Sequence, residues 1–332
     1  MIKPLALDDC RHGLPPARTR ILCSARQPTC WWLTHCFGPV RAARSTSFHT
    51  RKTPSPMNRT TKWLLAATAL AVPLVGLLAA RALTARRLHN DVKGLFAQAA
   101  ETAGLVYHES ELAGLPAPVQ RYFRHVLRDG QPYLRGLRLR HTGQFKTDLK
   151  KDWVDITGEQ YVTADPPGFI WQGTTSQFVA RDEFVAGHGR LDVRLLGAVP
   201  VAGGTGPAYD QGELLRWLVE SSWQPTALLP SKYIAWTTID DHSARLTLTH
   251  QGHTVSCLVR FNERSEIAEA EAPRQMDEAT ERPWLCLFEQ YRHWHGVLIP
   301  TVGEACWIID GQRQPYARFT VVALDYDQLQ PF

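Results

Sequence analysis

An eighteen-residue stretch without a charged side chain, from Trp63 to Ala80, constrains this 332-residue chain more than any other feature. At about 1.5 Å rise per residue a helix of this length spans roughly 27 Å, close to the hydrocarbon thickness of a bilayer. The stretch predicts a membrane segment at residues 57–85, either a cleaved signal or an uncleaved anchor. Its length favours the anchor, because signal peptides have shorter apolar cores.

The residues before this stretch do not resemble a folded domain. Residues 1–56 contain nine basic and two acidic residues, four of the seven cysteines and no sustained apolar period. They are interpreted as a disordered, transit-like leader or as an upstream extension of a chain that starts at Met57, and we favour the extension. Their charge of +7 exceeds the +5 of the whole chain, so the remainder carries −2. This balance argues against a nucleic-acid partner.

These features predict a single-pass protein of the inner (cytoplasmic) membrane with its main domain on the periplasmic or extracellular side. Basic residues flank the apolar stretch at both ends, so charge alone does not fix the orientation. A helical linker is expected over residues 86–130, where apolar residues recur at helical spacing. An antiparallel β domain is expected over residues 131–332.

The β domain is predicted from a change of apolar period. From residue 136 apolar side chains alternate with polar ones, which is typical of half-buried strands. Turn signals separate these runs, as at Gln251-Gly252 and Asp310-Gly311. Residues 201–207 are interpreted as a loop, and residues 284–295 give mixed signals. The pattern predicts a mainly β fold with few helices, a curled antiparallel sheet or half-barrel with one inserted short helix.

The inserted helix is expected over residues 212–222, with an apolar stripe and with Asp210 as its cap. Arg216 and Glu220 lie four residues apart, which suits a pair on the helix surface. The alternative buries both in the concave face of the sheet, where they would orient a lipid head group or fix the helix. The surface pair is the favoured interpretation.

Eight tryptophans lie in the β region. Large flat side chains line apolar ligand cavities, and they also fill ordinary β cores. Together with the anchor and the inserted helix, they predict an envelope protein that binds a lipid-like apolar ligand in a half-barrel cavity. The candidate ligand-binding residues are Trp171, Arg216, Glu220 and Trp236.

A metal site is an alternative. On a strand the side chains of His293 and His295 would share a face, and Glu304 and Cys306 on the next strand would complete the ligand set. The favoured interpretation is two half-exposed histidines that flank a core Trp294. A metal-dependent enzyme is therefore an alternative function, and a structural envelope interaction protein is another.

Other chemistry finds little support. The chain lacks a phosphate-binding loop, a nucleophile elbow and a zinc-protease motif. Asp182 and Glu183 are adjacent, so on a strand they point to opposite faces and cannot form a catalytic carboxylate pair. The sequence predicts no cofactor, and it leans away from an enzyme.

Several motifs carry a resemblance: LPAPVQRYFRHVL, PPGFIW, GELLRWLVESSWQP, GVLIPTVGEACWIIDG and FTVVALDYD. Over residues 115–326 the chain resembles an uncharacterised bacterial family with an N-terminal membrane segment and no established activity. More distantly, the order of strands and inserted helix is similar to periplasmic lipoprotein carriers of the Lol type. That resemblance implies a half-open β-barrel with helices over an apolar cavity.

Overall fold

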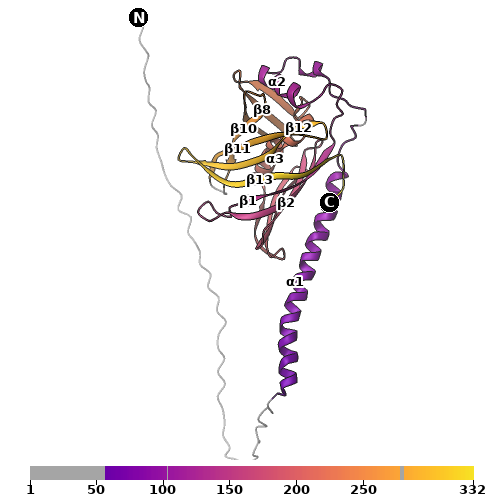
Figure 1. Cartoon of the computed structure of the whole chain (residues 1–332), viewed down its shortest axis with the longest axis vertical. Coiled ribbons are helices and arrows are strands. Elements are labelled where there is room, and N and C mark those ends of the chain that lie inside the picture. Colours follow the sequence, from indigo (N-terminus) through magenta and orange to yellow (C-terminus); the bar gives the residue numbers. More distant parts are fainter. Residues whose placement is uncertain (1–56, 103, 277–279) are drawn as a thin grey trace, which may run out of the picture. The chain divides into compact units, whose positions relative to one another are not determined.

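A computed structural model describes residues 57–332 of the chain, except residue 103 and residues 277–279. Residues 58–332 form one compact unit, shown in Figure 1. The interpretation of residues 1–56 lies outside the described residues.

The longest helix is α1 (Arg59–Phe96). Its last turns are buried, because Leu88, Val92 and Phe96 pack with Tyr161 and Ile170 of the sheet. In the described part of the chain, no helix has both the length and the apolarity needed to cross a membrane. The apolar stretch contains positions 66, 69, 70 and 73, whose side chains lie outside the described residues.

Two short helices follow before the sheet begins. They are η1 (Glu109–Leu112) and α2 (Ala117–Val126). The apolar face of α2 is fully covered, since Val119, Tyr122 and Phe123 are all completely buried in the main core. This helix therefore acts as a packing element against one end of the sheet.

In the part of the chain that the structure describes, thirteen strands form a single antiparallel sheet in the order β6-β5-β4-β3-β2-β1-β13-β12-β11-β10-β9-β8-β7. Their bounds are β1 Gly136–Phe145, β2 Val154–Thr163, β3 Gly168–Thr174, β4 Phe178–Val185, β5 His188–Leu195, β6 Val199–Thr205, β7 Ile234–Thr238, β8 Ser243–His250, β9 His253–Phe261, β10 Ile267–Gln275, β11 Glu281–Trp294, β12 Val297–Ile309 and β13 Gln312–Tyr326.

The topology explains how the sheet curls. The chain meanders from β1 at the centre out to the edge strand β6, and α3 (Pro207–Glu220) then carries it across to the opposite edge strand, β7. It meanders back to β13, which pairs with β1. Because α3 contacts β3 to β6 on one side and β9 and β10 on the other, it lies on the concave side (Figure 1). The prediction of a curled, mainly β fold with one inserted helix is confirmed.

Two local predictions were wrong. Residues 201–205, interpreted as part of a loop, belong to the edge strand β6, whose backbone pairs with β5 although most of its side chains are exposed. The inserted helix begins at Pro207 rather than near residue 212, so Asp210 lies inside its first turn. The Asp210 carboxylate accepts the Gly189 backbone N–H at 2.7 Å and ties the helix to β5 instead of capping it.

Alternate turns of an antiparallel meander lie at the same end of the sheet. The β1–β2, β3–β4 and β5–β6 turns (residues 146–153, 175–177 and 196–198) share one end, which we call the hairpin end. Helix α1 runs along the sheet from this end. Thr84 Oγ1 donates to the Gly197 carbonyl at 3.2 Å, and further along Asp91 pairs with Arg181 at 2.8 Å.

Candidate functional site on the concave face

A buried group of charged side chains lies beneath α3. The Arg216 guanidinium pairs with Asp182 on β4 at 2.6 Å and with Glu220 at 2.8 Å, and Glu220 also accepts the Gln160 amide N–H at 2.6 Å. Only 7% of Arg216 is exposed. The surface interpretation of the Arg216–Glu220 pair is therefore wrong, because the curled sheet covers the face of α3 that a helix on a flat surface would expose.

A second ion pair extends this group. Arg274 on β10 donates to Glu213 of α3 at 3.2 Å. Burial raises the pKa of Glu213 to about 8, and the nearby Asp182 carboxylate adds to the effect. Burial also raises the pKa of Asp182, against the opposing effect of Arg216. We call the five residues Asp182, Glu213, Arg216, Glu220 and Arg274 the ionic cluster.

The ionic cluster holds three carboxyl groups and two guanidinium groups. If all were ionised, a buried negative charge would remain without compensation, which is strongly unfavourable in a low-dielectric interior. Burial raises the pKa of both Glu213 and Asp182, so the cluster favours holding a proton that offsets the excess negative charge. The cluster is therefore close to neutral when one proton is held on Glu213.

Two aromatic rings lie flat on the sheet next to the cluster. The indole N–H of Trp171 donates to Nε2 of His141 at 2.7 Å, and the two ring planes are parallel. Directly paired glycines make this possible, because a Cβ at Gly158 would overlap the His141 ring and one at Gly173 would overlap Trp171. Phe319 stacks on His141 with 4.1 Å between centroids. We call Trp171, His141 and Phe319 the aromatic plate.

The plate and the cluster meet at Arg216. Its guanidinium carbon lies 4.8 Å from the centroid of the Trp171 ring, within the range of a cation–π interaction. Burial, together with the Arg216 charge, lowers the pKa of His141 to about 3. The imidazole is therefore neutral, and because Nε2 accepts a hydrogen bond its proton lies on Nδ1.

Two buried polar atoms of this region have no hydrogen-bond partner among the described residues. They are Nδ1 of His141 and Oε2 of Glu213. His141 is 3% exposed and Glu213 is 5% exposed. Buried polar atoms are nearly always hydrogen-bonded in folded proteins, so each of these two atoms has unmet hydrogen-bonding capacity.

The aromatic surface continues from the cluster toward the hairpin end. Arg274 lies 4.7 Å from the Trp284 ring, and the Trp284 indole donates to the Tyr316 hydroxyl at 2.8 Å. Tyr316 in turn contacts Phe145 edge to face and stacks with Trp307. Phe145, Tyr316 and Phe319 are half-buried. The concave face thus presents partly exposed aromatic rings between the ionic cluster and the turns.

Directly under α3 the hollow is filled. Leu214, Trp217 and Leu218 are at most 2% exposed and pack into the main core. Two cavities, of about 350 Å³ and 570 Å³, lie elsewhere. The first is lined around Gln131 and Tyr326 and the second around Thr142 and Thr174, and no residue of α3 lines either. Neither cavity lies between α3 and the sheet, where an open cavity was expected.

The structure brings three of the four predicted ligand-binding residues together. Trp171, Arg216 and Glu220 meet in the plate and cluster described above. Trp236 lies apart from them: its indole donates to the Leu228 carbonyl at 2.9 Å, and its ring contacts Phe123 of α2 edge to face. The glycine pair that supports the plate and the carboxylates of Asp182 and Glu213 were not among the predicted site residues.

The predicted metal ligands are not brought together. No group of three metal-ligating side chains lies close enough to hold an ion in the part of the chain that the structure describes. His293 pairs with Leu298 on β12, whereas Glu304 pairs with Leu287. Leu287 and His293 are six residues apart on β11, so Glu304 lies about 20 Å from His293 along the strand direction. His295 lies in the β11–β12 turn, beyond the end of β11, and has φ of 49°.

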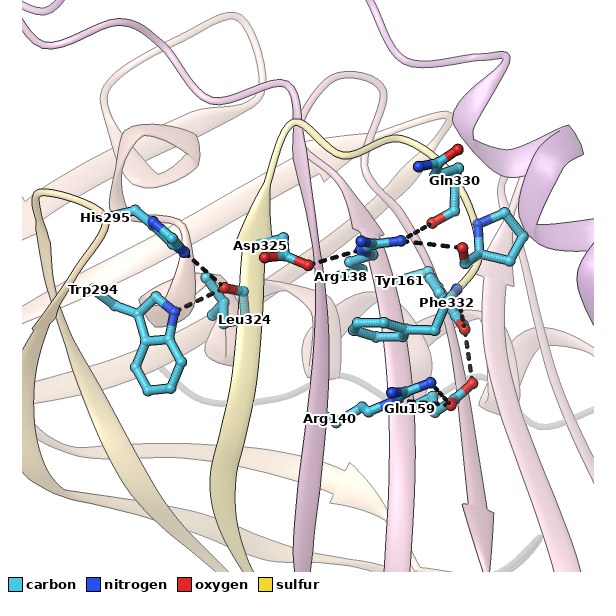
Figure 2. A network of polar contacts seen from close by, with 11 residues as sticks. Arg138, Arg140, Glu159, Tyr161, Trp294, His295, Leu324, Asp325, Gln330 and Phe332 are labelled. Atoms are coloured by element: carbon cyan, nitrogen blue, oxygen red, sulfur yellow. Dashed lines mark hydrogen bonds and ion pairs between the residues drawn. The ribbon is translucent and has the colours of Figure 1, made fainter.

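The surroundings of His295 are structural. Figure 2 shows Trp294 and His295 directed at the same acceptor, the Leu324 carbonyl, at 2.7 Å and 3.2 Å. On the neighbouring strands Arg138 pairs with Asp325, and Arg140 with Glu159 (Figure 2). These contacts tie the end of β13 and the C-terminal residues to the sheet.

The protein is thus built as a curled, unclosed antiparallel sheet with a helix across its concave side. The chain belongs to a family of unknown function (DUF6544), whose model matches residues 105–319. This agrees with the resemblance to an uncharacterised family stated from the sequence motifs. No curated protein matches the chain.

The chain also shows low similarity to several solved structures. A putative outer membrane lipoprotein-sorting protein domain from Vibrio parahaemolyticus is 8% identical, with TM-score 0.33, over 58% of this chain and 86% of that one. The LolA superfamily protein NE2245 from Nitrosomonas europaea is 10% identical, with TM-score 0.31, over 64% and 94%. A DUF1329 family protein from Desulfovibrio piger is 10% identical, with TM-score 0.29, over 64% and 91%.

Proposed function

We propose that this protein is a membrane-tethered envelope protein whose concave face binds a lipid-like amphiphile. One observation carries the proposal: half-buried aromatic side chains, among them Phe145, Tyr316 and Phe319, lead from the hairpin end to a buried ionic cluster. Apolar surface next to a few fixed polar groups is the usual composition of a small-molecule site. Such a surface suits a ligand with an apolar tail and a polar head.

The polar end of the ligand has defined partners in this proposal. Nδ1–H of His141 offers a donor, and protonated Glu213 offers its second oxygen, and both are buried beside Arg216. Arg216 itself is held by Asp182 and Glu220 and serves to position the plate. The ligand head group would therefore contain at least one hydrogen-bond acceptor for His141 and sit at the inner limit of the aromatic surface.

The tether is the apolar stretch Trp63–Ala80. We propose a single span of the inner membrane with the β domain on the periplasmic or extracellular side. The support is the length and composition of the stretch and its continuity with α1, whose Thr84 contacts the hairpin end. In this arrangement the partly exposed aromatic rings open toward the bilayer, from which a lipid would enter.

Lipid extraction from the purified full chain, followed by mass spectrometry, tests the binding. The informative variant is Phe145→Gln, which removes a half-buried ring of the concave surface. The matched control is Val322→Gln, which changes a 51% exposed apolar residue on β13. We expect a defined lipid class with the native chain and the control, and several-fold less with Phe145→Gln. An equal lipid complement in all three would overturn the proposal.

A further inference from the structure

The β5–β6 turn carries the most exposed group of apolar side chains on the described sheet. Leu195 and Leu196 are each 45% exposed, and Val199 and Val201 are 56% and 57% exposed. All four lie within seven residues, at the tip and on the outer strand of one hairpin. A contiguous apolar patch of this kind on a folded protein usually marks an interaction surface.

The tip has an unusual residue for its backbone conformation. Leu196 has φ of 51° and is followed by Gly197 with φ of 71°. Four other described hairpin turns also have a residue with positive φ followed by a glycine with positive φ. In those turns the first residue is Ala186, Gln251, His295 or Asp310. A positive φ is disfavoured for a bulky side chain, so a large exposed leucine here costs stability without gaining core packing.

The position of the tip indicates what covers it. The Thr84 hydroxyl donates to the Gly197 carbonyl at 3.2 Å, and Arg81 lies beside the same glycine. Thr84 is four residues beyond the apolar stretch, about 6 Å along a helix. The tip therefore lies at the level where α1 continues into the stretch Trp63–Ala80.

We propose that the β5–β6 tip inserts its four apolar side chains into the surface of a membrane leaflet that carries anionic lipids. This inference rests on the tether of the proposed function. A small excess of positive charge accompanies the apolar patch: Arg81 adjoins the tip, and in the β1–β2 turn at the same end three lysines (Lys146, Lys150 and Lys151) outnumber two aspartates (Asp148 and Asp152). Apolar insertion combined with cationic contacts is the usual basis of interfacial membrane binding.

The insertion orients the domain. With α1 and the tip both held at the bilayer, the sheet has two separate points of attachment and cannot swing freely about the helix. The hairpin end, and with it the partly exposed aromatic rings of the concave face, is then held against the lipid surface.

The test uses the full chain reconstituted in phosphatidylcholine–phosphatidylglycerol vesicles that contain a photoactivatable lipid. Labelled segments are identified by mass spectrometry. The variant Leu196→Asn/Val201→Thr removes apolar surface, and asparagine suits the positive φ of residue 196, so the hairpin should fold at least as well. The matched control is Ile239→Asn, a 48% exposed residue in the β7–β8 turn at the opposite end of the sheet.

We expect strong labelling of residues 190–206 in the native chain and in the control, and about tenfold less in the double variant. Labelling of residues 63–80 without labelling of the hairpin would overturn the insertion while leaving the tether intact. An absence of labelling at both places would overturn the tether, and the insertion with it. Equal hairpin labelling in the native chain and the double variant would also overturn the insertion.

Discussion

The indole N–H of Trp171 donates to Nε2 of His141, and the two rings lie in parallel planes on a strip of sheet that has no side chains beneath them. Gly158 lies directly between the partners on β2, paired with His141 on one side and with Gly173 on the other. The arrangement depends on the missing Cβ atoms and holds the aromatic plate close to the sheet.

The first prediction concerns this glycine strip. Replacing Gly158 with alanine puts a methyl group where the His141 ring lies, so the ring must move. We expect Gly158→Ala to lower the free energy of unfolding by about 1–3 kcal/mol, as overpacking of a core does. Urea denaturation measures the change. The control is Gly303→Ala, where an added Cβ meets only the Leu287 carbonyl at 3.8 Å. Equal effects of the two variants would contradict a special role for the strip.

The second prediction concerns the charge balance beneath α3. Arg216→Met leaves the partly buried carboxylates of Asp182 and Glu220 without their common partner, and breaking a buried ion pair typically costs about 3–5 kcal/mol. The control is Arg313→Met, which removes a 54% exposed side chain from its pair with Glu269 and should cost less than about 1 kcal/mol. Similar losses in urea denaturation for both would show that the buried pair is not structurally important.

The third prediction concerns pH. The pKa of Glu213 is about 8 in the folded protein, above its ordinary value of 4.5. Between these values the folded state binds more protons than the unfolded state, so this group's contribution to stability is lost as pH rises toward 8. Glu213→Gln should weaken that decline, whereas Glu263→Gln, at an exposed position, should not. The measurement is the free energy of unfolding from pH 5 to 8.5. An unchanged slope in Glu213→Gln would contradict the assignment.

The fourth prediction has the opposite sign. Burial lowers the pKa of His141 from 6.5 to about 3. As the pH falls, His141 therefore becomes protonated in the unfolded state at a higher pH than in the folded state. The stability that a neutral His141 allows is present above pH 6.5 and is lost as pH falls from 6.5 toward 3. His141→Gln should reduce this acid destabilisation, and exposed His242→Gln should leave it unchanged. Chemical denaturation at pH 4 and pH 7 distinguishes them, and equal pH dependence in both would argue against a buried neutral imidazole.

The strands could be predicted because their evidence is local. Alternation around Leu137 and Leu139 and the turns at Gln251-Gly252 and Asp310-Gly311 mark where the backbone must extend and reverse. Strand β6 escaped prediction because it has almost no buried side chains and is held by backbone pairing with β5. Register was also beyond local evidence: sequence spacing suggested one face for His293 and His295 and one face of the next strand for Glu304 and Cys306, but the pairing of β11 and β12 places Glu304 away from His293.

By itself, the sequence determined that this chain forms an antiparallel meander with one inserted helix after a long apolar stretch, because period, turns and composition act within a few residues. Only the tertiary structure decided that Arg216 is buried with the partly buried Glu220 as its partner, and that Trp171 rather than Trp236 joins them. The physical reason is the curl of the sheet: it brings Asp182, Arg274 and His141 from distant strands around α3, and no local pattern records which side chains that curvature encloses.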